Sequence, residues 1–115
     1  MTMLVAFTFH AKPGREREFE ALLNNPEAAR HVARAIGATR NTLYRSGGRM
    51  IRILEFPDGA KPVPLAEVAA RDPDVRDFLR KLGLLIEDGF DIDGPETLDS
   101  LNKRALVPLA FDVRP

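Results

Sequence analysis

Arg52 is the residue of this sequence whose position most demands a chemical explanation. It lies in the middle of RMIRILEF, residues 49–56, whose other members read largely as one apolar strand. Because removing a fixed charge from water is costly, an arginine in such a strand needs a partner. The partner is either a carboxylate, such as Glu55 or Asp88, or an oxygen-rich ligand. Carboxylate, enolate and phenolate oxygens all match the planar guanidinium fork. Glu55 points to the opposite face of the strand, which weakens the first explanation.

Two further side chains are candidates for proton transfer. His10 closes the first predicted strand, where an imidazole titrating near neutral pH is suited to acid or base chemistry. Tyr44, the only tyrosine, lies on a predicted strand and is a second candidate proton donor. An exposed strand-end histidine and a sheet-wall tyrosine are the structural alternatives. His31 falls on the rim of an apolar helical stripe, which favours a packing role. With no cysteine and no HxH or HExxH motif, we expect no metal site.

The period-two geometry of a strand identifies the side chains that accompany Arg52. Met50, Leu54 and Phe56 share its face. On the preceding strand, the same face carries either Arg40, Thr42 and Tyr44 or Asn41, Leu43 and Arg45, and the sequence leaves both possibilities open. We therefore expect the substrate-binding residues to be Arg40, Asn41, Met50, Leu54 and, from the apolar stripe of a helix, Phe78.

The elements that must position these residues follow the order β-α-β-β-α-β. The apolar periodicity predicts strands at residues 3–10, 39–46, 49–56 and 104–113. It predicts helices at residues 15–23, 26–36 and 65–70, another that starts after Asp72 and continues until Gly89, and a short one at residues 95–104. Gly47 and Gly48 suit a two-residue hairpin turn, and Pro108 places the last strand at an edge or a bulge.

The predicted sheet is apolar on both faces. The first strand carries Val5, Phe7 and Phe9 on one face and Leu4 and Ala6 on the other. A doubly apolar sheet must be covered twice, and the chain has enough helix for one side. We therefore expect an α+β fold, a ferredoxin-like four-stranded antiparallel sheet with helices on one face, whose second face packs against another copy in a homodimeric α/β barrel.

Length and composition exclude several classes of protein. A chain of 115 residues makes one domain, residues 1–115, which is long enough to bury a core without disulfides. The net charge of zero gives no general attraction to nucleic acid or to an anionic membrane. No apolar run approaches the roughly 20 residues of a membrane span. The absence of cysteine and of a signal-peptide pattern favours a cytoplasmic location.

Four segments give the chain a resemblance to a known family. FHAKPGREREFEALL, TLYRSGGRMIRILEF, ARDPDVRDFLRKLG and RALVPLAF, in this order, resemble the SchA/CurD-like proteins of aromatic polyketide biosynthesis over nearly the whole chain. More loosely, the chain is similar to the tetracenomycin-type polyketide cyclases, which share the dimeric α+β barrel. In those cyclases a histidine stands at the position of Arg52, and an arginine stands at the position of Asn41.

The resemblance implies a cyclase that folds a poly-β-ketone in an apolar pocket without a cofactor. Arg52 would hold an enolate or phenolate, and His10 or Tyr44 would move the proton. Two alternatives use the same pocket: a cofactor-independent monooxygenase, or a protein that binds the intermediate without catalysis. The basic side chains Arg76, Arg80 and Lys81 leave an acyl carrier protein open as a partner, although a solvated helix face explains them equally.

Overall fold

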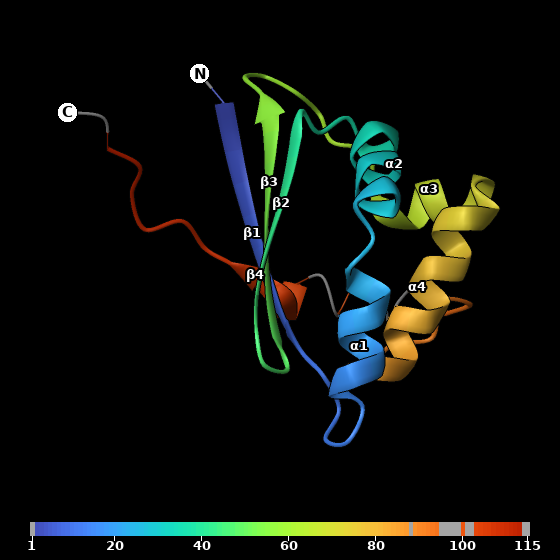
Figure 1. Ribbon diagram of the computed structural model, residues 1–115. Coiled ribbons are helices and arrows are strands. Elements are labelled where there is room, and N and C mark those ends of the chain that lie inside the picture. The colour runs from blue at the N-terminus through green and yellow to red at the C-terminus, as the bar shows by residue number, and fades with distance from the viewer. Residues whose placement is uncertain (1, 88, 95–99, 101–102, 114–115) are drawn as a thin grey trace.

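The computed structural model describes residues 2–87, 89–94, 100 and 103–113, which form an α+β fold (Figure 1). The strands are β1 (Thr2–His10), β2 (Arg40–Ser46), β3 (Arg49–Pro57) and β4 (Leu106–Val107). The helices are α1 (Glu16–Leu23), α2 (Pro26–Ile36), α3 (Leu65–Arg71) and α4 (Pro73–Leu85). Most of these bounds fall within one or two residues of those that the sequence predicts.

The four strands form one antiparallel sheet in the order β2-β3-β1-β4. This order, together with the succession of strands and helices, is compatible with the predicted ferredoxin-like fold. β1 and β3 pair along their full lengths, from Thr2 opposite Pro57 to His10 opposite Arg49. β2 and β3 form a hairpin, and Gly47 adopts the positive φ of 58° that such a tight turn requires.

Capping residues fix the helices that cover the sheet. The side chain of Asn25 accepts a hydrogen bond from the backbone N–H of Ala28, and Pro26 occupies the first turn of α2. Gly37 ends the same helix in the left-handed conformation, with φ of 86°. Asp72 caps α4, as the sequence predicts. These residues are local signals, which is why the helix starts could be located from the sequence.

Helices α1 to α4 all lie on one side of the sheet (Figure 1). The core fills the space between this side and the helices, and its largest fully buried side chains are Phe19, Met50, Ile86, Val68 and Val75. We call this side of the sheet the covered face and the other side the open face. The C-terminal segment after β4 extends away from the helices, beyond the open face (Figure 1).

The end of α4 differs from the prediction. The helix ends at Leu85 rather than continuing to Gly89, because Ile86 turns to an extended conformation and bridges to Ala11. The backbone N–H of Lys12 donates to the Leu85 carbonyl oxygen at 2.8 Å, and that of Glu87 donates to the His10 oxygen at 2.8 Å. Pairing with the end of β1 thus replaces the last predicted helical turn.

The last strand is much shorter than the ten residues predicted. β4 comprises Leu106 and Val107 and pairs with the edge of β1. Pro108 has no N–H to donate and therefore ends the pairing, as expected of an edge strand. In the short helix predicted at residues 95–104, residues 100, 103 and 104 are helical, and the rest lie outside the described residues.

Among the described residues, no helix has the length and hydropathy needed to cross a membrane.

Candidate functional site

A pocket of about 240 Å³ lies between the covered face of the sheet and the helices. We call it the Arg52 pocket, because Arg52 is the one polar side chain among its described lining residues. Five of the seven phenylalanines of the chain line it. The lining residues are Val5, Phe7, Phe9, Val32, Ile36, Arg52, Leu54, Phe56, Pro62, Val63, Leu65, Phe78, Leu79, Leu82 and Phe90.

Arg52 lies on the middle of β3, directly opposite Phe7 of β1 and Leu43 of β2. Its Nε atom is buried, and no described residue accepts a hydrogen bond from it. Burial in apolar surroundings lowers the pKa of the Arg52 guanidinium from its usual value. An unsatisfied buried donor on a charged group is costly, so it points to a partner that enters the pocket.

The carboxylate explanation for Arg52 does not hold for Glu55. The Glu55 side chain lies on the open face, where its Oε2 is 3.6 Å from Nε of Arg40 on the neighbouring strand. The second candidate partner, Asp88, lies outside the described residues. Among the described residues, Arg52 therefore has no ion-pair partner.

The register of the hairpin resolves which face β2 presents to the pocket. Asn41 lies opposite Leu54, and Leu43 lies opposite Arg52, so both belong to the covered face. Asn41 donates through Nδ2 to the carbonyl oxygen of Ala29 at 3.1 Å, while its Oδ1 is buried without a described partner. Asn41 ties β2 to α2 beside the pocket but is not one of the lining residues.

Three of the predicted site residues lie on the open face instead. Arg40, Tyr44 and His10 have side chains that alternate away from the pocket, because they are one residue out of phase with Asn41 and Phe9. Tyr44 is 60% exposed, and His10 is exposed at the end of β1. The structure therefore does not bring His10 and Tyr44 together with Arg52.

The remaining predicted binding residues divide between the pocket and the core. Leu54 and Phe78 line the pocket, and Met50 is fully buried in the core without lining it. Sequence reasoning missed Pro62, Val63 and Leu65, which come from the segment after β3, and Phe90, which follows α4. The apolar residues in the segment KPVPL were the one available signal that this loop lines a pocket, because a loop exposed to solvent is usually polar.

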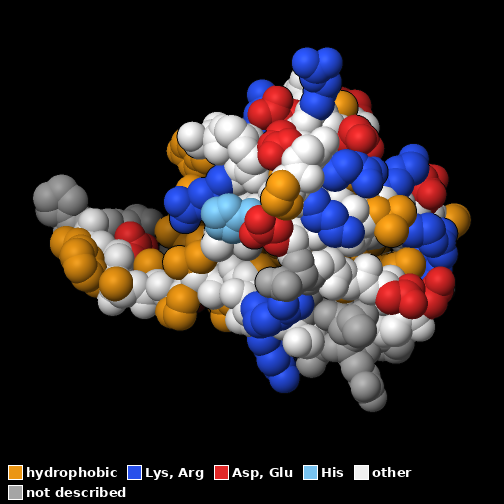
Figure 2. Space-filling model, turned by 90° about the horizontal axis from the view of Figure 1, so that it is seen from below, with side chains coloured by type: hydrophobic (Ala, Val, Ile, Leu, Met, Phe, Trp, Pro, Cys, Tyr) orange, Lys and Arg blue, Asp and Glu red, His pale blue; other side chains and the backbone are white. Residues whose placement is uncertain are grey.

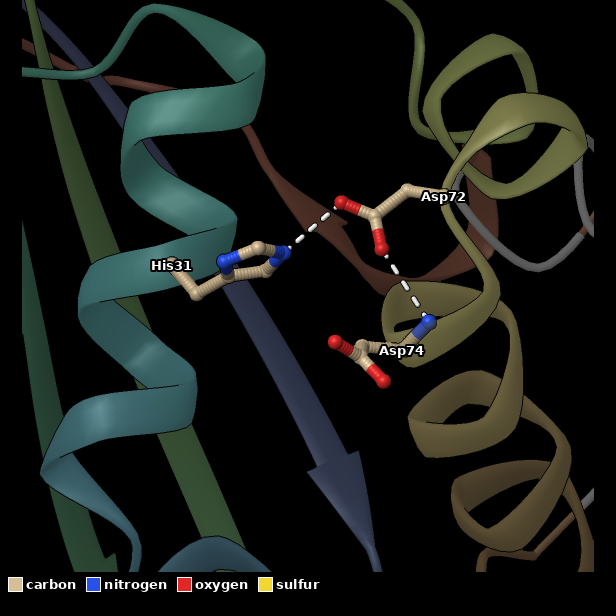
Figure 3. A group of neighbouring side chains, drawn as sticks. All are labelled: His31, Asp72 and Asp74. Carbon is tan, nitrogen blue, oxygen red and sulfur yellow. Dashed lines mark hydrogen bonds and ion pairs between the residues drawn. The ribbon is translucent and has the colours of Figure 1, made fainter.

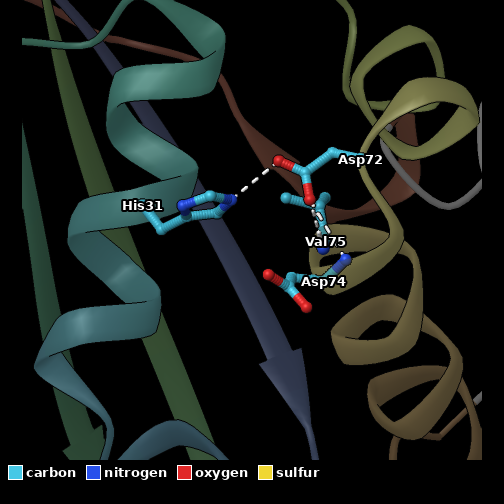
Figure 4. Close-up of polar contacts among 4 residues, drawn as sticks. All are labelled: His31, Asp72, Asp74 and Val75. Carbon is cyan, nitrogen blue, oxygen red and sulfur yellow. Dashed lines mark hydrogen bonds and ion pairs between the residues drawn. The ribbon is translucent and has the colours of Figure 1, made fainter.

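A second cluster joins α2 to the start of α4. Nε2 of His31 lies 2.7 Å from Oδ2 of Asp72, and Asp74 lies beside them (Figure 3). The other oxygen of Asp72 accepts hydrogen bonds from the backbone N–H groups of Asp74, at 3.0 Å, and of Val75, at 3.2 Å (Figure 4). The sequence predicted the cap on α4 but assigned His31 to packing.

The same cluster is the one group of side chains among the described residues that could hold a metal ion. His31, Asp72 and Asp74 each offer one ligand atom, and these atoms lie within 4.8 Å of one another. However, both oxygens of Asp72 already accept hydrogen bonds: one oxygen accepts from His31 of α2, and the other accepts from backbone N–H groups in the first turn of α4. The bond from His31, followed by those from the backbone, lowers the pKa of the Asp72 carboxyl group. The arrangement is that of a charged helix cap.

The basic residues of α4 are engaged with carboxylates. Arg76 pairs with Asp93, and Nη2 of Arg80 lies 3.6 Å from the same carboxylate. Nζ of Lys81 lies 3.1 Å from Asp77, one turn earlier. On the face shown in Figure 2, blue and red side chains intermingle over the body of the molecule, whereas orange side chains gather on the projecting segment. These pairings weaken the case for a basic docking face.

The chain matches no known family model, and searches of curated proteins and of solved structures find no significant match.

Proposed function

We propose that this protein is a cyclase of aromatic polyketide intermediates that binds its substrate in the Arg52 pocket. One observation carries the proposal: a guanidinium without a described partner faces a pocket whose other described lining residues are apolar. A carbon acid between two carbonyl groups, once ionised, supplies the delocalised oxyanion that such a cation would bind.

Arg52 would act by stabilising the enolate. A nearby positive charge favours the ionised form of an acid, and the effect is strongest where water is excluded. The substrate methylene group would lose its proton to solvent, and the resulting enolate carbon would attack a ketone carbon of the same molecule. The carbon–carbon bond forms as the ketone oxygen becomes an alkoxide, which takes up a proton. Loss of one water molecule and enolisation of the remaining ring ketones then leave the aromatic ring.

A second candidate function, binding without catalysis, is favoured by a specific observation. Apart from Arg52, no titratable side chain is among the described residues that line the pocket. His10 and Tyr44, which the resemblance suggests as proton carriers, belong to the other face of the sheet. A protein of this kind would hold an ionised intermediate and protect it from water.

Benzoylacetone, a 1,3-diketone with one aromatic ring, provides a direct test. Its enolate absorbs in the ultraviolet, so the pKa of the bound diketone can be read by titration. We expect the wild-type protein to lower that pKa and the Arg52→Met variant not to lower it. The loss of affinity for the enolate should be at least about 10-fold, the scale of a charge-assisted hydrogen bond worth roughly 1.5–3 kcal/mol.

Arg49→Met is the matched control, because Arg49 lies on the same strand but on the open face. It should titrate the diketone like the wild type. The cyclase is supported if the wild-type protein accelerates ring closure of a linear aromatic triketone and Arg52→Met abolishes this acceleration. An unchanged titration with Arg52→Met contradicts both functions. Oxygen consumption with anthrone would indicate the monooxygenase instead.

Stability provides an independent test of the role of Arg52. Removing an unpaired charge from an apolar pocket relieves its desolvation cost, so Arg52→Met should melt no lower than the wild type. If Arg52 instead balanced a buried carboxylate, its loss would cost about 3–5 kcal/mol. Thermal unfolding of the two proteins at one pH separates these outcomes by sign.

We further propose that a second copy of the chain covers the open face, giving a homodimeric barrel. Ile51 and Ile53 of β3 are only half-buried there, and no described helix packs on them. The projecting C-terminal segment adds exposed apolar side chains, Leu109, Phe111 and Val113, between 64% and 78% exposed. Exposed apolar surface of this kind marks an interface.

Light scattering at micromolar concentration should give about twice the mass of 12.8 kDa. Ile53→Lys places a charge in the middle of the proposed interface and should halve the measured mass. A monomeric wild-type protein would rule out the barrel while leaving the Arg52 pocket, which lies on the other face, unaffected.

A further inference from the structure

We infer that the ligand of the Arg52 pocket is a monoanion whose enclosed part is a bicyclic aromatic ring system, rather than a polyphenol of three or more rings. The inference rests on the proposed function, since it names the class of molecule that the same pocket takes. It is drawn from the size of the pocket, the chemistry of its wall and its charge.

The size of the pocket limits the ring system. An apolar cavity of about 150 Å³ in a protein interior accommodates benzene, with six carbon atoms. The Arg52 pocket, at about 240 Å³, is about 1.6 times as large. A second fused ring raises the carbon count from six to ten, by nearly the same factor. A third ring raises it to fourteen, by a factor of about 2.3, so part of it would extend out of the enclosed space.

The wall of the pocket favours flat aromatic ligands. Phe7 and Phe9 come from β1, Phe56 from β3, Phe78 from α4, and Phe90 from the segment after α4. Phenylalanine rings on several sides offer edge-to-face and offset contacts to a ring placed between them. A flexible aliphatic chain would make no such directed contacts and would lose more rotational entropy on binding.

The charge of the pocket sets the charge of the ligand. Arg52 provides one guanidinium, and the described lining residues contain no other charged group. A neutral ligand would leave the buried Nε–H without a strong acceptor. A dianion would bring a second charge into the same apolar wall without a partner. One carboxylate, enolate or phenolate at the end of the ring system satisfies Arg52 and adds no unpaired charge.

Four probes measured by titration calorimetry test the inference on the wild-type protein: benzoate, 2-naphthoate, anthracene-2-carboxylate and methyl 2-naphthoate. We expect 2-naphthoate to bind at least 10-fold tighter than benzoate, and at least 10-fold tighter than its neutral methyl ester. We expect the third ring of anthracene-2-carboxylate to add less than a threefold gain. With Arg52→Met, the preference for the acid over the ester should disappear, while Arg49→Met should retain it.

The failures are distinguishable. If none of the four probes binds while the pKa of bound benzoylacetone is still lowered, the inference alone fails; if both tests are negative, the proposed function fails with it. If the ester binds as tightly as the acid, the charge assignment is overturned. If anthracene-2-carboxylate binds more than threefold tighter than 2-naphthoate, the size limit alone is overturned, and the Arg52 pocket remains a binding site.

Phe78→Ala tests the size limit from the side of the protein. Phe78 belongs to the wall formed by α4 and is only half-buried, so its truncation enlarges the pocket without emptying the core. We expect the affinity for anthracene-2-carboxylate relative to 2-naphthoate to rise at least 10-fold in this variant. An unchanged ratio would show that the volume of the pocket does not select the ligand.

Discussion

The covered and open faces of the sheet are built from alternate residues of the same strands, yet they carry different chemistry. On the covered face, β1 and β3 present Phe7, Phe9 and Leu54, with Arg52 among them. On the open face, the same strands present residues such as Ile51 and Ile53, and β2 adds the exposed Tyr44. The comparison teaches that an apolar pattern cannot by itself identify the site. A charge without a described partner marks the covered face as the candidate.

The largest expected difference between the faces is in their sensitivity to truncation. Met50 is fully buried on the covered face, so Met50→Ala should cost about 2–5 kcal/mol of unfolding free energy at any protein concentration. Its neighbour Ile51 lies on the open face. Ile51→Ala should cost less in dilute protein and more when the concentration favours the dimer. Urea unfolding at two protein concentrations measures both. A concentration-independent cost for Ile51→Ala would contradict the covering of the open face by a second copy.

A smaller effect is expected where α4 packs closely against the segment that follows it. A Cβ added to Gly83 of α4 would lie 2.4 Å from the carbonyl oxygen of Phe90. Alanine is the better helix former by about 1 kcal/mol, yet we expect Gly83→Ala to destabilise the protein by about 1–3 kcal/mol through overpacking. Leu84→Ala, at a position 60% exposed, is the control and should be nearly neutral. Thermal unfolding should show a lower melting temperature for Gly83→Ala alone. Stabilisation by this change would mean that residues 83 and 90 do not approach so closely.

The smallest effect depends on pH and concerns the clamp between α2 and α4, by which we mean the hydrogen bond between His31 and Asp72. The folded pKa of Asp72 is lowered by the hydrogen bond from His31 and then by backbone bonds. Its contribution is therefore fully present above the unfolded carboxyl pKa of about 3.9 and is lost as the pH falls through the folded value. Asp72→Ser retains a capping oxygen without the charge. We expect it to melt below the wild type at pH 7, with the difference shrinking at pH 3. A difference in melting temperature that does not change with pH would show that the charge of Asp72 does not contribute to the clamp.

Local signals in the sequence predicted most of the fold. Pro26, Gly37 and Asp72 act through their own backbone neighbours, so the helix ends that they mark agree with the structure. The predicted end of α4 was wrong because Ile86 pairs with Ala11, about 75 residues earlier in the chain. No local sequence pattern indicates such a long-range contact. The predicted last strand was too long because Pro108 has no N–H to donate and ends the pairing with β1, although the apolar pattern continues beyond it.

The site was predictable in part, because some of its residues are placed by local strand geometry and others by contacts between distant segments. Arg52, Leu54 and Phe56 had to share a face once β3 was recognised. The phase of β2 follows from the two-residue turn at Gly47 and Gly48, which pairs Ser46 with Arg49 and therefore Leu43 with Arg52. Asn41 could thus have been separated from Arg40 by counting back from the predicted turn. The pocket wall at Pro62, Val63 and Phe90 comes from irregular segments, where periodicity carries no information.

The position of β3 between two partners has a consequence for the order in which the molecule opens. β3 is hydrogen-bonded to β1 on one side and to β2 on the other, so its amides, including that of Arg52, should exchange with solvent deuterium only on global unfolding. Another part of the pocket wall, at residues 62–65, is a loop and a helix start with few backbone partners. We expect it to exchange much faster. A ligand of the proposed site would then enter and leave by transient opening of this segment, while the Arg52 guanidinium stays anchored on the most slowly exchanging strand.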